Sequence, residues 1–223
     1  MPRTARASAG NVCYHVLNRG NGGNEVFHEP EDYAAFLRLL KQGNERLPIR
    51  LIAYCVMPDH FHLIVWPRKA GDLSLWVQWL LTSHVHRYHG TYDSSGHVWQ
   101  GRFKSFPIQQ DEHLLTAIRY VEQNPVRAKT IPVRKAERWP WSSASTVTPA
   151  NAERPTLHAG PVPRGKEWLE QIKQPLGEEE LAALRESVAR GKPFGSERWA
   201  KRTATKLGLE SSLRPRGRPK SGS

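Results

Sequence analysis

Two histidines, His60 and His62, are separated by a single residue within an apolar stretch of this 223-residue chain. On an extended strand, residues two apart point to the same face, so the two imidazoles would lie side by side while Phe61 turns into the core. Imidazole nitrogens are the commonest protein ligands of borderline divalent metals. The pair could therefore supply half of a metal site, with a third ligand from another element. Two surface or hydrogen-bonded histidines without a metal are the alternative.

A tyrosine and an asparagine stand four residues apart near the end of a helix expected over 113–123, which Pro125 should terminate. Tyr120 and Asn124 share one helical face if the last turn holds. Two imidazoles and an amide oxygen could hold a divalent cation, and a phenol beside that cation would be a nucleophile for a metal-polarised phosphate. A tyrosine on an amphipathic helix more often borders a core, so this spacing alone leaves both interpretations open.

A predicted hairpin positions the histidine pair. Residues 51–56 and 63–66 are apolar runs of strand length, and residues 57–59 between them indicate a turn. The histidines would therefore stand where the second strand begins, near the rim of a sheet, where a site can be both rigid and accessible.

The segments before and after this hairpin predict the rest of the fold. A strand is expected over 11–17, amphipathic helices over 29–44 and 73–88, and a strand-like run over 97–106. The resulting order, strand, helix, strand, strand, helix, strand, helix, favours an α+β fold. We expect a mainly antiparallel, ferredoxin-like sheet with helices on one face.

The charge of the chain indicates a nucleic-acid partner. Thirty-three Lys and Arg against 21 Asp and Glu give a formal net charge of +12. An excess of this size points first to nucleic acid, although a merely solvated basic surface would give the same value. Residues 190–223 contain ten Lys and Arg and two Glu, so they hold +8 of this charge. Electrostatics there should dominate nucleic-acid affinity and make it sensitive to salt.

Polar residues in a loop and in the strand-like run over 97–106 could contact nucleic acid directly. A glycine-rich loop after the first strand carries Asn18 and Arg19, which could reach a phosphate or a base edge. An ordinary flexible turn is the alternative. Arg102 and Lys104 are mixed with aromatic residues over 97–106, a composition that suits single-stranded nucleic acid. A core strand with a solvated face would explain the same pattern.

The basic C-terminal end contains a further candidate. Arg214, Arg216 and Arg218 belong to an Arg-Pro-Arg-Gly-Arg-Pro-Lys segment that resembles an AT-hook, an extended motif that lies in the DNA minor groove. A solvated disordered tail is the competing interpretation, because short basic motifs give many false matches.

Composition divides the chain into four parts. We expect a flexible basic arm (1–10), the α+β domain (11–145), a linker with a short helix (146–189) and a basic DNA-binding tail (190–223). No run approaches the ~18 apolar residues that a membrane span needs, and two cysteines do not make a disulfide framework. These features predict a cytoplasmic protein without membrane contact.

Four segments resemble the single-tyrosine HUH transposases of bacterial insertion sequences, and specifically the REP-associated tyrosine transposases. In family order they are YHVLNRG (14–20), VMPDHFH (56–62), WQGRFKS (99–105) and YVEQNPVRA (120–128). The basic C-terminal extension with its Arg-Pro-rich end is also similar to the REP-associated branch. The resemblance covers the chain from about residue 12 to residue 143 and implies the HUH single-tyrosine transposase fold.

The resemblance implies cleavage and rejoining of single-stranded DNA, guided by hairpins of repetitive extragenic palindromes. His60 and His62 match the metal-binding pair of the family, with Mg²⁺ or Mn²⁺ as the ion. Tyr120 matches the nucleophile, which forms a 5′-phosphotyrosine and releases a 3′-hydroxyl. Asn124 falls at the position of the third ligand. Many members of the family carry glutamine there, and asparagine offers the same amide oxygen on a shorter arm.

The resemblance also bears on DNA reading, partners and location. Asn18, Arg19 and Arg102 become candidates for reading the short sequence beside the hairpin, and Lys104 or a metal-bound water for taking the phenol proton. Phenols have an ordinary pKa of about 10, so deprotonation needs help at neutral pH. The REP-associated branch tends to act as monomers and insertion-sequence relatives as dimers, and we expect a monomer. The resemblance implies a bacterial protein that is associated with the nucleoid when bound to DNA.

Two other functions fit the same residues. In the first, a metal nuclease activates water and Tyr120 only packs in the core. In the second, a DNA-binding protein without catalysis acts on hairpins as a regulator, although the intact His60, His62 and Tyr120 argue against such a loss.

Overall fold

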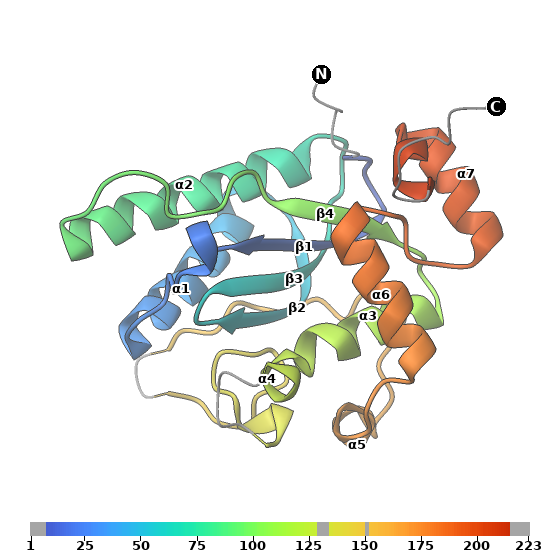
Figure 1. The fold of residues 1–223 in the computed structure, drawn as a ribbon. Helices are drawn as coiled ribbons and strands as arrows, with labels where there is room; N and C mark the ends of the chain where they lie inside the picture. Colours follow the sequence, from blue (N-terminus) through green and yellow to red (C-terminus); the bar gives the residue numbers. More distant parts are fainter. Residues whose placement is uncertain (1–7, 129–133, 150–151, 215–223) are drawn as a thin grey trace, which may run out of the picture.

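The computed structural model describes residues 8–128, 134–149 and 152–214, and a four-stranded antiparallel sheet forms its centre (Figure 1). The strands are β1 (Cys13–Arg19), β2 (Arg50–Met57), β3 (His60–Trp66) and β4 (Lys104–Ile108), in the order β2-β3-β1-β4. Every neighbouring pair is antiparallel. The predicted α+β class with an antiparallel sheet is confirmed.

The hairpin of β2 and β3 forms where the sequence predicted it. Met57 pairs with His60, so Pro58 and Asp59 alone form the turn. The loop after β1 holds this turn, because the backbone N–H of Gly20 donates to the Asp59 carbonyl at 2.7 Å. Gly20 cannot carry a side chain here, since a Cβ atom would lie 2.1 Å from the Asn24 carbonyl oxygen. The hairpin turn and the glycine-rich loop therefore form one rigid corner.

Two long helices cover one face of the sheet (Figure 1). They are α1 (Pro30–Arg46) and α2 (Asp72–Tyr92), which extend slightly beyond the predicted helices. Their apolar residues form one core with Tyr14, Phe61 and Leu63 of the strands. Phe61 is thus buried on the face opposite to the histidine pair, as the alternation of a strand predicts.

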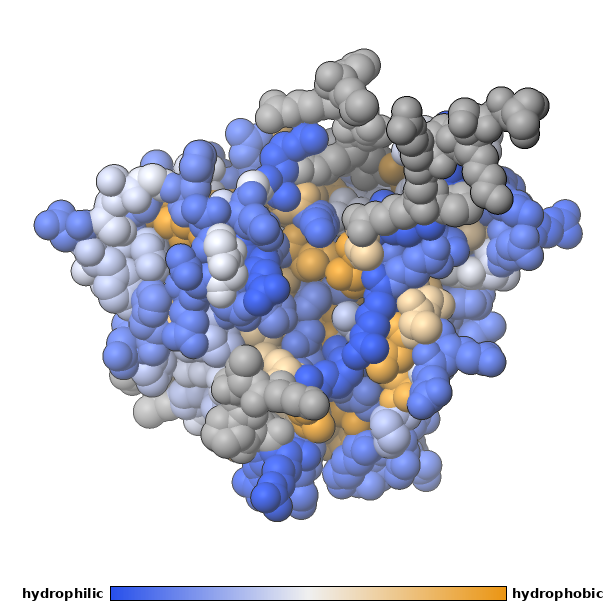
Figure 2. All heavy atoms as spheres, in the orientation of Figure 1, coloured by the Kyte–Doolittle hydropathy of each residue, from blue (hydrophilic) through white to orange (hydrophobic). Residues whose placement is uncertain are grey.

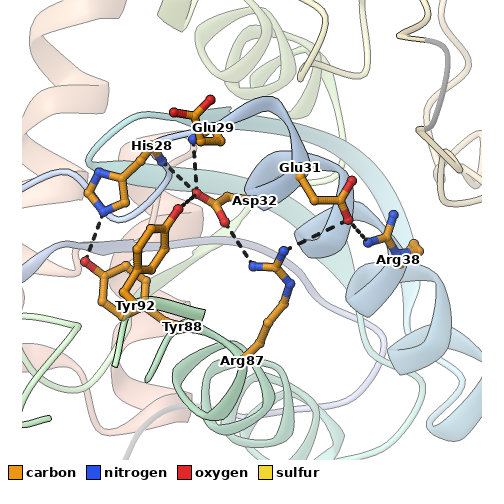
Figure 3. A network of polar contacts seen from close by, with 8 residues as sticks. All are labelled: His28, Glu29, Glu31, Asp32, Arg38, Arg87, Tyr88 and Tyr92. Atoms are coloured by element: carbon orange, nitrogen blue, oxygen red, sulfur yellow. Dashed lines mark hydrogen bonds and ion pairs between the residues drawn. The ribbon is translucent and has the colours of Figure 1, made fainter. Parts of the chain in front are cut away.

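A buried aspartate joins the two helices of this face (Figure 3). Asp32, in the first turn of α1, accepts hydrogen bonds from the backbone N–H groups of His28 and Glu29 at 2.9 and 3.1 Å. Its carboxylate also accepts from Tyr92 Oη at 2.5 Å and from Arg87 Nη1 at 2.9 Å, both on α2. Asp32 therefore caps α1 and fixes the end of α2 against it.

Helices also cover the opposite face, which corrects the expectation of helices on one face only. They are α3 (Glu112–Glu122), α4 (Asn124–Arg127), α5 (Trp168–Lys173) and α6 (Glu178–Arg190). With Ile64 and Phe106 of the strands they form a second core. The physical reason was visible in the sequence, because β2 and β3 are nearly continuous apolar runs, typical of strands that are buried on both faces.

The strand expected over 97–106 is shorter than predicted. Residues 97–103 form a loop that touches the sheet through an isolated bridge between Trp99 and Gly20, and β4 begins only at Lys104. Gly101 has a φ of 147°, a conformation that interrupts an extended run. The loop therefore stands over the ends of β1 and β3 and does not continue the sheet.

The predicted C-terminal tail is partly folded. It contains α7 (Glu197–Leu207), and Phe194 lies parallel to β4, where its N–H donates to the Pro107 carbonyl at 2.9 Å. Residues 191–196 thereby cover the exposed edge of the sheet. Short 3₁₀ helices occupy three connections: η1 (Asn21–Gly23), η2 (Ala136–Arg138) and η3 (Glu210–Leu213). Within the described ranges, no helix is both long and apolar enough to cross a membrane.

Candidate active site

A cleft of about 800 Å³ opens where the ends of β1 and β3 meet the 100–104 loop and the helices α3, α4 and α6. The surrounding face is mostly hydrophilic, with apolar side chains visible in its central part (Figure 2). Eight residues that the sequence singled out line this cleft: Asn18, Arg19, His60, His62, Arg102, Lys104, Tyr120 and Asn124. Arg214 is exposed after η3 and does not line it, and Arg216 and Arg218 lie outside the described residues.

The two histidines lie on one face of β3, as their spacing predicted. Their ring centroids are 5.0 Å apart and the ring planes are nearly perpendicular, at 85°. His62 is buried, whereas His60, the first residue of β3, is partly exposed. The pair therefore presents two imidazoles to the same cleft from different depths.

Each imidazole is held from behind through its Nδ1 atom. His60 Nδ1 lies 2.5 Å from the Asp59 carboxylate, and His62 Nδ1 lies 2.8 Å from His15 Nε2 on the neighbouring strand β1. These contacts leave the Nε2 atom of each ring as the one that could bind a ligand. Metal-binding histidines in proteins are commonly oriented in this manner, by a partner on the second ring nitrogen.

Burial controls the protonation of this group. Burial lowers the pKa of His62 well below its ordinary value and that of His15 to about 3, so both rings are neutral at physiological pH. Burial alone would raise the pKa of Asp59, but the hydrogen bond and charge of His60 and the charge of Arg19 outweigh it and lower this pKa. Neutral imidazoles keep the lone pairs that a divalent cation needs. Together with the amide of Asn124, the residues present fit such a cation.

A second group of metal-type side chains lies outside the cleft. Asp111, Glu112 and His113 bring one ligand atom each to within 4.8 Å of one another at the start of α3. Asp111 is already used as the helix cap, because it accepts from the His113 N–H at 3.0 Å and contacts His113 Nδ1 at 2.8 Å. These contacts account for the cluster as a helix start.

Tyr120 stands at the end of α3 with its ring among the imidazoles. Its ring centroid is 5.9 Å from that of His62 and 6.0 Å from that of His15, in edge-to-face contacts. Tyr120 is only 8% exposed and lines the cleft, so the cleft is the route by which a substrate could reach it. Leu114 and Ile118 pack against the sheet and fix the rotation of the helix that points Tyr120 inward.

The end of α3 brings Asn124 to the same cleft as Tyr120. The helix ends at Glu122, but Gln123 keeps a nearly helical backbone (φ −83°, ψ −1°) and α4 begins directly at Asn124. Pro125 therefore ends the first helix and occupies the first turn of the second, where its missing N–H costs nothing. Tyr120 and Asn124 therefore lie on two successive helices and not on one helical face as predicted, but both line the cleft.

Polar contacts fix the mouth of the cleft. Arg19 lies across from His60 in the register of β1 and β3, and its Nε donates to the Asp59 carboxylate at 2.9 Å. The Asn18 side chain donates to the Gly101 carbonyl at 3.2 Å and thereby holds the loop that carries Arg102. Charged groups thus surround the histidine pair on the side that faces solvent.

Sequence reasoning missed three residues that contact this site. His15 belongs to another strand, and only the pairing register places it behind His62. Asp59 could have been noticed as the residue before His60. Arg127 could have been noticed as well, because it stands seven residues after Tyr120 and so falls near the same helical face.

Comparisons with known proteins agree with this geometry. Residues 8–124 match the sequence profile of the family described as "Transposase IS200 like". A curated protein of Haemophilus influenzae, assigned as a REP-associated tyrosine transposase, is 29% identical over 119 residues. The match covers 48% of this chain and 66% of that protein, so the chain spans just under two thirds of the length of this relative.

One of two similar solved structures is alike enough to show the same fold. The structure of a REP-associated tyrosine transposase bound to a REP hairpin has a TM-score of 0.52 and 19% identity, covering 64% of this chain and 81% of that one. A structure from Deinococcus radiodurans, assigned as a transposase, covers 55% of this chain and 96% of that one, with a TM-score of 0.39 and 18% identity. The first likeness supports the arrangement of the sheet and its helices.

Proposed function

Because this chain belongs to the IS200-like transposase family, we propose that it cleaves and rejoins single-stranded DNA at REP-type hairpins, with Tyr120 as the nucleophile. The observation that carries the proposal is the position of the Tyr120 ring, 5.9 Å from the His62 ring in a shared cleft. A hydroxyl nucleophile beside a metal-type ligand pair suits transfer of a phosphodiester to the protein. The names of a similar curated protein and of a similar solved structure support REP hairpins as the partner.

Three side chains of the cleft would hold a divalent cation, Mg²⁺ or Mn²⁺. They are His60 and His62 through Nε2 and Asn124 through its amide oxygen. When bound, such a cation supplies Lewis-acid polarisation of a phosphate oxygen. All three ligand groups are uncharged, so the DNA phosphate would bring the negative charge that completes the site.

In the proposed reaction the Tyr120 Oη attacks the phosphorus atom, and the bond from phosphorus to the 3′ oxygen breaks. The phenol proton leaves to water, or to Lys104 in its neutral amine form, and the departing oxygen takes up a proton from water to become a 3′-hydroxyl. The product is a 5′-phosphotyrosine. Attack by the 3′-hydroxyl of another strand end reverses the reaction, and the conserved phosphoester bond removes any need for ATP.

Covalent capture tests this function. The full chain is incubated with a labelled single-stranded hairpin oligonucleotide and Mg²⁺ or Mn²⁺, and the products are separated on a denaturing protein gel. We expect a metal-dependent labelled band that disappears in Tyr120→Phe. Tyr88→Phe is the matched control, because the Tyr88 hydroxyl contacts His28 on the surface of the α1–α2 layer.

The other outcomes assign the competing functions. Cleavage that persists in Tyr120→Phe without a labelled band would indicate a nuclease that activates water. Tight hairpin binding with neither cleavage nor a band would indicate a non-catalytic DNA-binding protein. Each result would overturn the tyrosine mechanism.

The C-terminal region is proposed to strengthen DNA binding. Basic side chains on α7, including Arg198, Arg202 and Lys206, are exposed or partly exposed, and Lys201 is paired with Glu197 at 2.6 Å. Arg214, Arg216 and Arg218 would extend this basic surface toward the hairpin stem, as an AT-hook or as a charged tail. Within the domain, Asn18, Arg19, Arg102 and Lys104 are the proposed contacts for the single-stranded flank.

A further inference from the structure

An arginine lies directly against the proposed nucleophile. The Cζ atom of Arg127 is 4.1 Å from the centroid of the Tyr120 ring, so its guanidinium lies over the ring. Its Nη2 also donates a hydrogen bond to the backbone carbonyl of Tyr120. Arg127 is placed by α4, the short helix that Asn124 and Pro125 begin, and it lines the same cleft. Its position is therefore fixed relative to the phenol by two contacts.

The charge of this guanidinium is not compensated by the protein. Among the residues that the structure describes, Arg127 forms no ion pair, and its Nη1 atom is buried without a hydrogen-bond partner. Burial, foremost, lowers the pKa of Arg127, and the charge of Arg185 adds to this effect. The charge of Arg127 in turn lowers the pKa of His15 and of His62. A guanidinium with a buried Nη1 that has no partner is costly, and an anion in the cleft would offset that cost.

The other arginines of the cleft are in different situations. Arg19 is paired with Asp59 at 2.8 Å, and Arg102 and Arg185 are exposed. Arg127 is partly buried, and among these four it alone combines that position with the absence of a carboxylate partner in the described chain and contact with the tyrosine ring. A phosphodiester is the anion that Tyr120 must reach under the proposed function, and a guanidinium binds phosphate oxygens through its N–H groups.

We propose that Arg127 is a further catalytic residue, whose guanidinium binds the scissile phosphate and holds the Tyr120 ring in position for attack. This inference rests on the proposed function. The guanidinium of Arg127 would then bind the same phosphate that a cation held by His60 and His62 would polarise. Charge that grows on the non-bridging oxygens of this phosphate during attack would be stabilised by both groups.

A double-mutant cycle, in which a DNA phosphate and Arg127 are changed separately and together, tests their contact. It measures binding affinity only and does not depend on cleavage. All proteins carry Tyr120→Phe, which blocks covalent capture but keeps the ring, and EDTA removes divalent ions. Affinity is measured for a hairpin with an all-phosphate flank and for hairpins with one uncharged methylphosphonate link, moved along the flank one position at a time. The proteins compared are Tyr120→Phe itself, its Arg127→Gln variant and its Arg119→Gln variant.

Arg119 is the matched control, because it lies on α3 and its guanidinium donates to the carbonyls of Gln174 and Pro175, outside the cleft. At one link we expect the methylphosphonate to weaken binding about tenfold in Tyr120→Phe and in the Arg119→Gln variant, and less than twofold in the Arg127→Gln variant. Equal losses in all three proteins at every link would overturn the inference. Thermal unfolding checks that the variants are folded. If Arg127→Gln does not fold, Arg127→Lys, which keeps the charge but changes the geometry of the donors, replaces it in the comparison.

The two proposals can fail separately. A response confined to one link and lost in Arg127→Gln keeps Arg127 as a phosphate site even when no phosphotyrosine forms. Covalent capture together with equal losses in the cycle keeps the tyrosine mechanism and rejects the role of Arg127. In the active protein, Arg127→Lys should slow single-turnover cleavage by about 10²-fold, since one preorganised donor to the transition state is misplaced.

Discussion

The orientation of His62 depends on His15, which is not one of the proposed metal ligands. With Nε2 directed to a cation, His62 must carry its proton on Nδ1 and donate it to His15 Nε2, 2.8 Å away. His15 then has its own proton on Nδ1, which is buried without a partner among the described residues. Metal binding therefore selects one of the two possible tautomer arrangements of this pair, and His15 makes that arrangement available.

Replacing His15 should weaken metal binding without touching the ligands. We expect His15→Phe to lower Mn²⁺ affinity by about 10- to 100-fold, because His62 loses the acceptor that orients its ring. Titration of Mn²⁺ followed by electron paramagnetic resonance measures this change. His113→Ala is the control and should leave the affinity unchanged. Loss of binding in the control instead would place the ion in the Asp111–His113 cluster.

The sequence predicted the residues that line the cleft better than the residues that hold them in position. His60 and His62 face one side because a strand alternates, and the four-residue spacing of Tyr120 and Asn124 brought both to the cleft although the helix breaks between them. Such rules act within one element. His15 could not be predicted in this way, because its contact with His62 depends on the register between two strands, which no local pattern specifies.

At the scale of elements, the helix that carries Tyr120 is fixed by a buried carboxylate two residues later. Glu122 accepts hydrogen bonds from Ser143 Oγ at 2.6 Å and Trp168 Nε1 at 2.8 Å, and Arg164 Nη1 lies 3.6 Å away. Burial raises the pKa of Glu122, so its charged form depends on these donors. The network ties α3 to the segment that leads into α5.

Removing one donor of this network should loosen the position of α3. We expect Trp168→Phe to lower the free energy of unfolding by roughly 1–3 kcal/mol, because the Glu122 carboxylate loses a buried partner. Urea unfolding measures the change. Trp66→Phe is the comparison, since the Trp66 Nε1 has no acceptor within the described chain, so this substitution removes no hydrogen bond and affects only packing and the contact of the ring with Arg50. A larger loss in Trp66→Phe than in Trp168→Phe would show that packing outweighs this hydrogen bond.

Asp32 gives the α1–α2 layer a stability that depends on pH. Burial alone would raise its pKa, but the hydrogen bonds from Tyr92, two backbone N–H groups and Arg87 outweigh burial and lower it below the ordinary value of 3.8. A carboxyl group with a lowered folded-state pKa stabilises the fold above its unfolded pKa and loses this effect as pH falls through the folded value.

We therefore expect Asp32→Asn to cost roughly 2–4 kcal/mol of unfolding free energy at pH 7, and this difference to shrink as pH falls below 3.8. Chemical denaturation of both proteins between pH 7 and pH 3 measures it. Asp72→Asn is the control, because Asp72 accepts only an exposed backbone N–H, from Lys69 at 2.9 Å. A difference that stays constant with pH would contradict the role of the charge.

The elements themselves were predictable where one pattern dominated. The hairpin follows from two apolar runs, and α1, α2 and α3 follow from apolar spacing; all four were confirmed, and α6 is the short helix expected within 146–189. The 97–103 loop was mistaken for a strand, because aromatic and basic residues alternate there while Gly101 interrupts the extended backbone. The pairing of Phe194 with the edge of β4 was not predicted, since it joins segments about 85 residues apart and depends on an unpaired edge that only the folded sheet creates.

At the scale of the whole molecule, the positive charge is divided between a folded site and a basic end. The cleft holds Arg19, Arg102, Lys104 and Arg127, whereas residues 190–223 contribute +8 of the net charge of +12. Under the proposed function, the cleft residues would act on the single-stranded flank that is cleaved. The C-terminal end can act on the double-stranded stem, where affinity through phosphates accumulates without sequence reading.

Removing residues 215–223 should change affinity much more than catalysis. The deletion takes away Arg216, Arg218 and Lys220, so the slope of log affinity against log salt should fall by about two to three. Single-turnover cleavage at saturating protein should stay within about twofold of the intact chain, because no residue of the cleft is changed. Equal salt slopes for both proteins would show that this end does not contact the DNA.

A charge-conserving variant separates the two interpretations of that end. An AT-hook inserts its arginines into a narrow A·T-rich minor groove, so Arg216→Lys with Arg218→Lys should weaken binding to hairpins with A·T-rich stems and leave G·C-rich stems unaffected. A disordered charged tail acts through charge alone, so the same variant should bind both stems like the intact chain. Competition between the two stems at one salt concentration decides the question, because the total charge of the protein is the same in both arms.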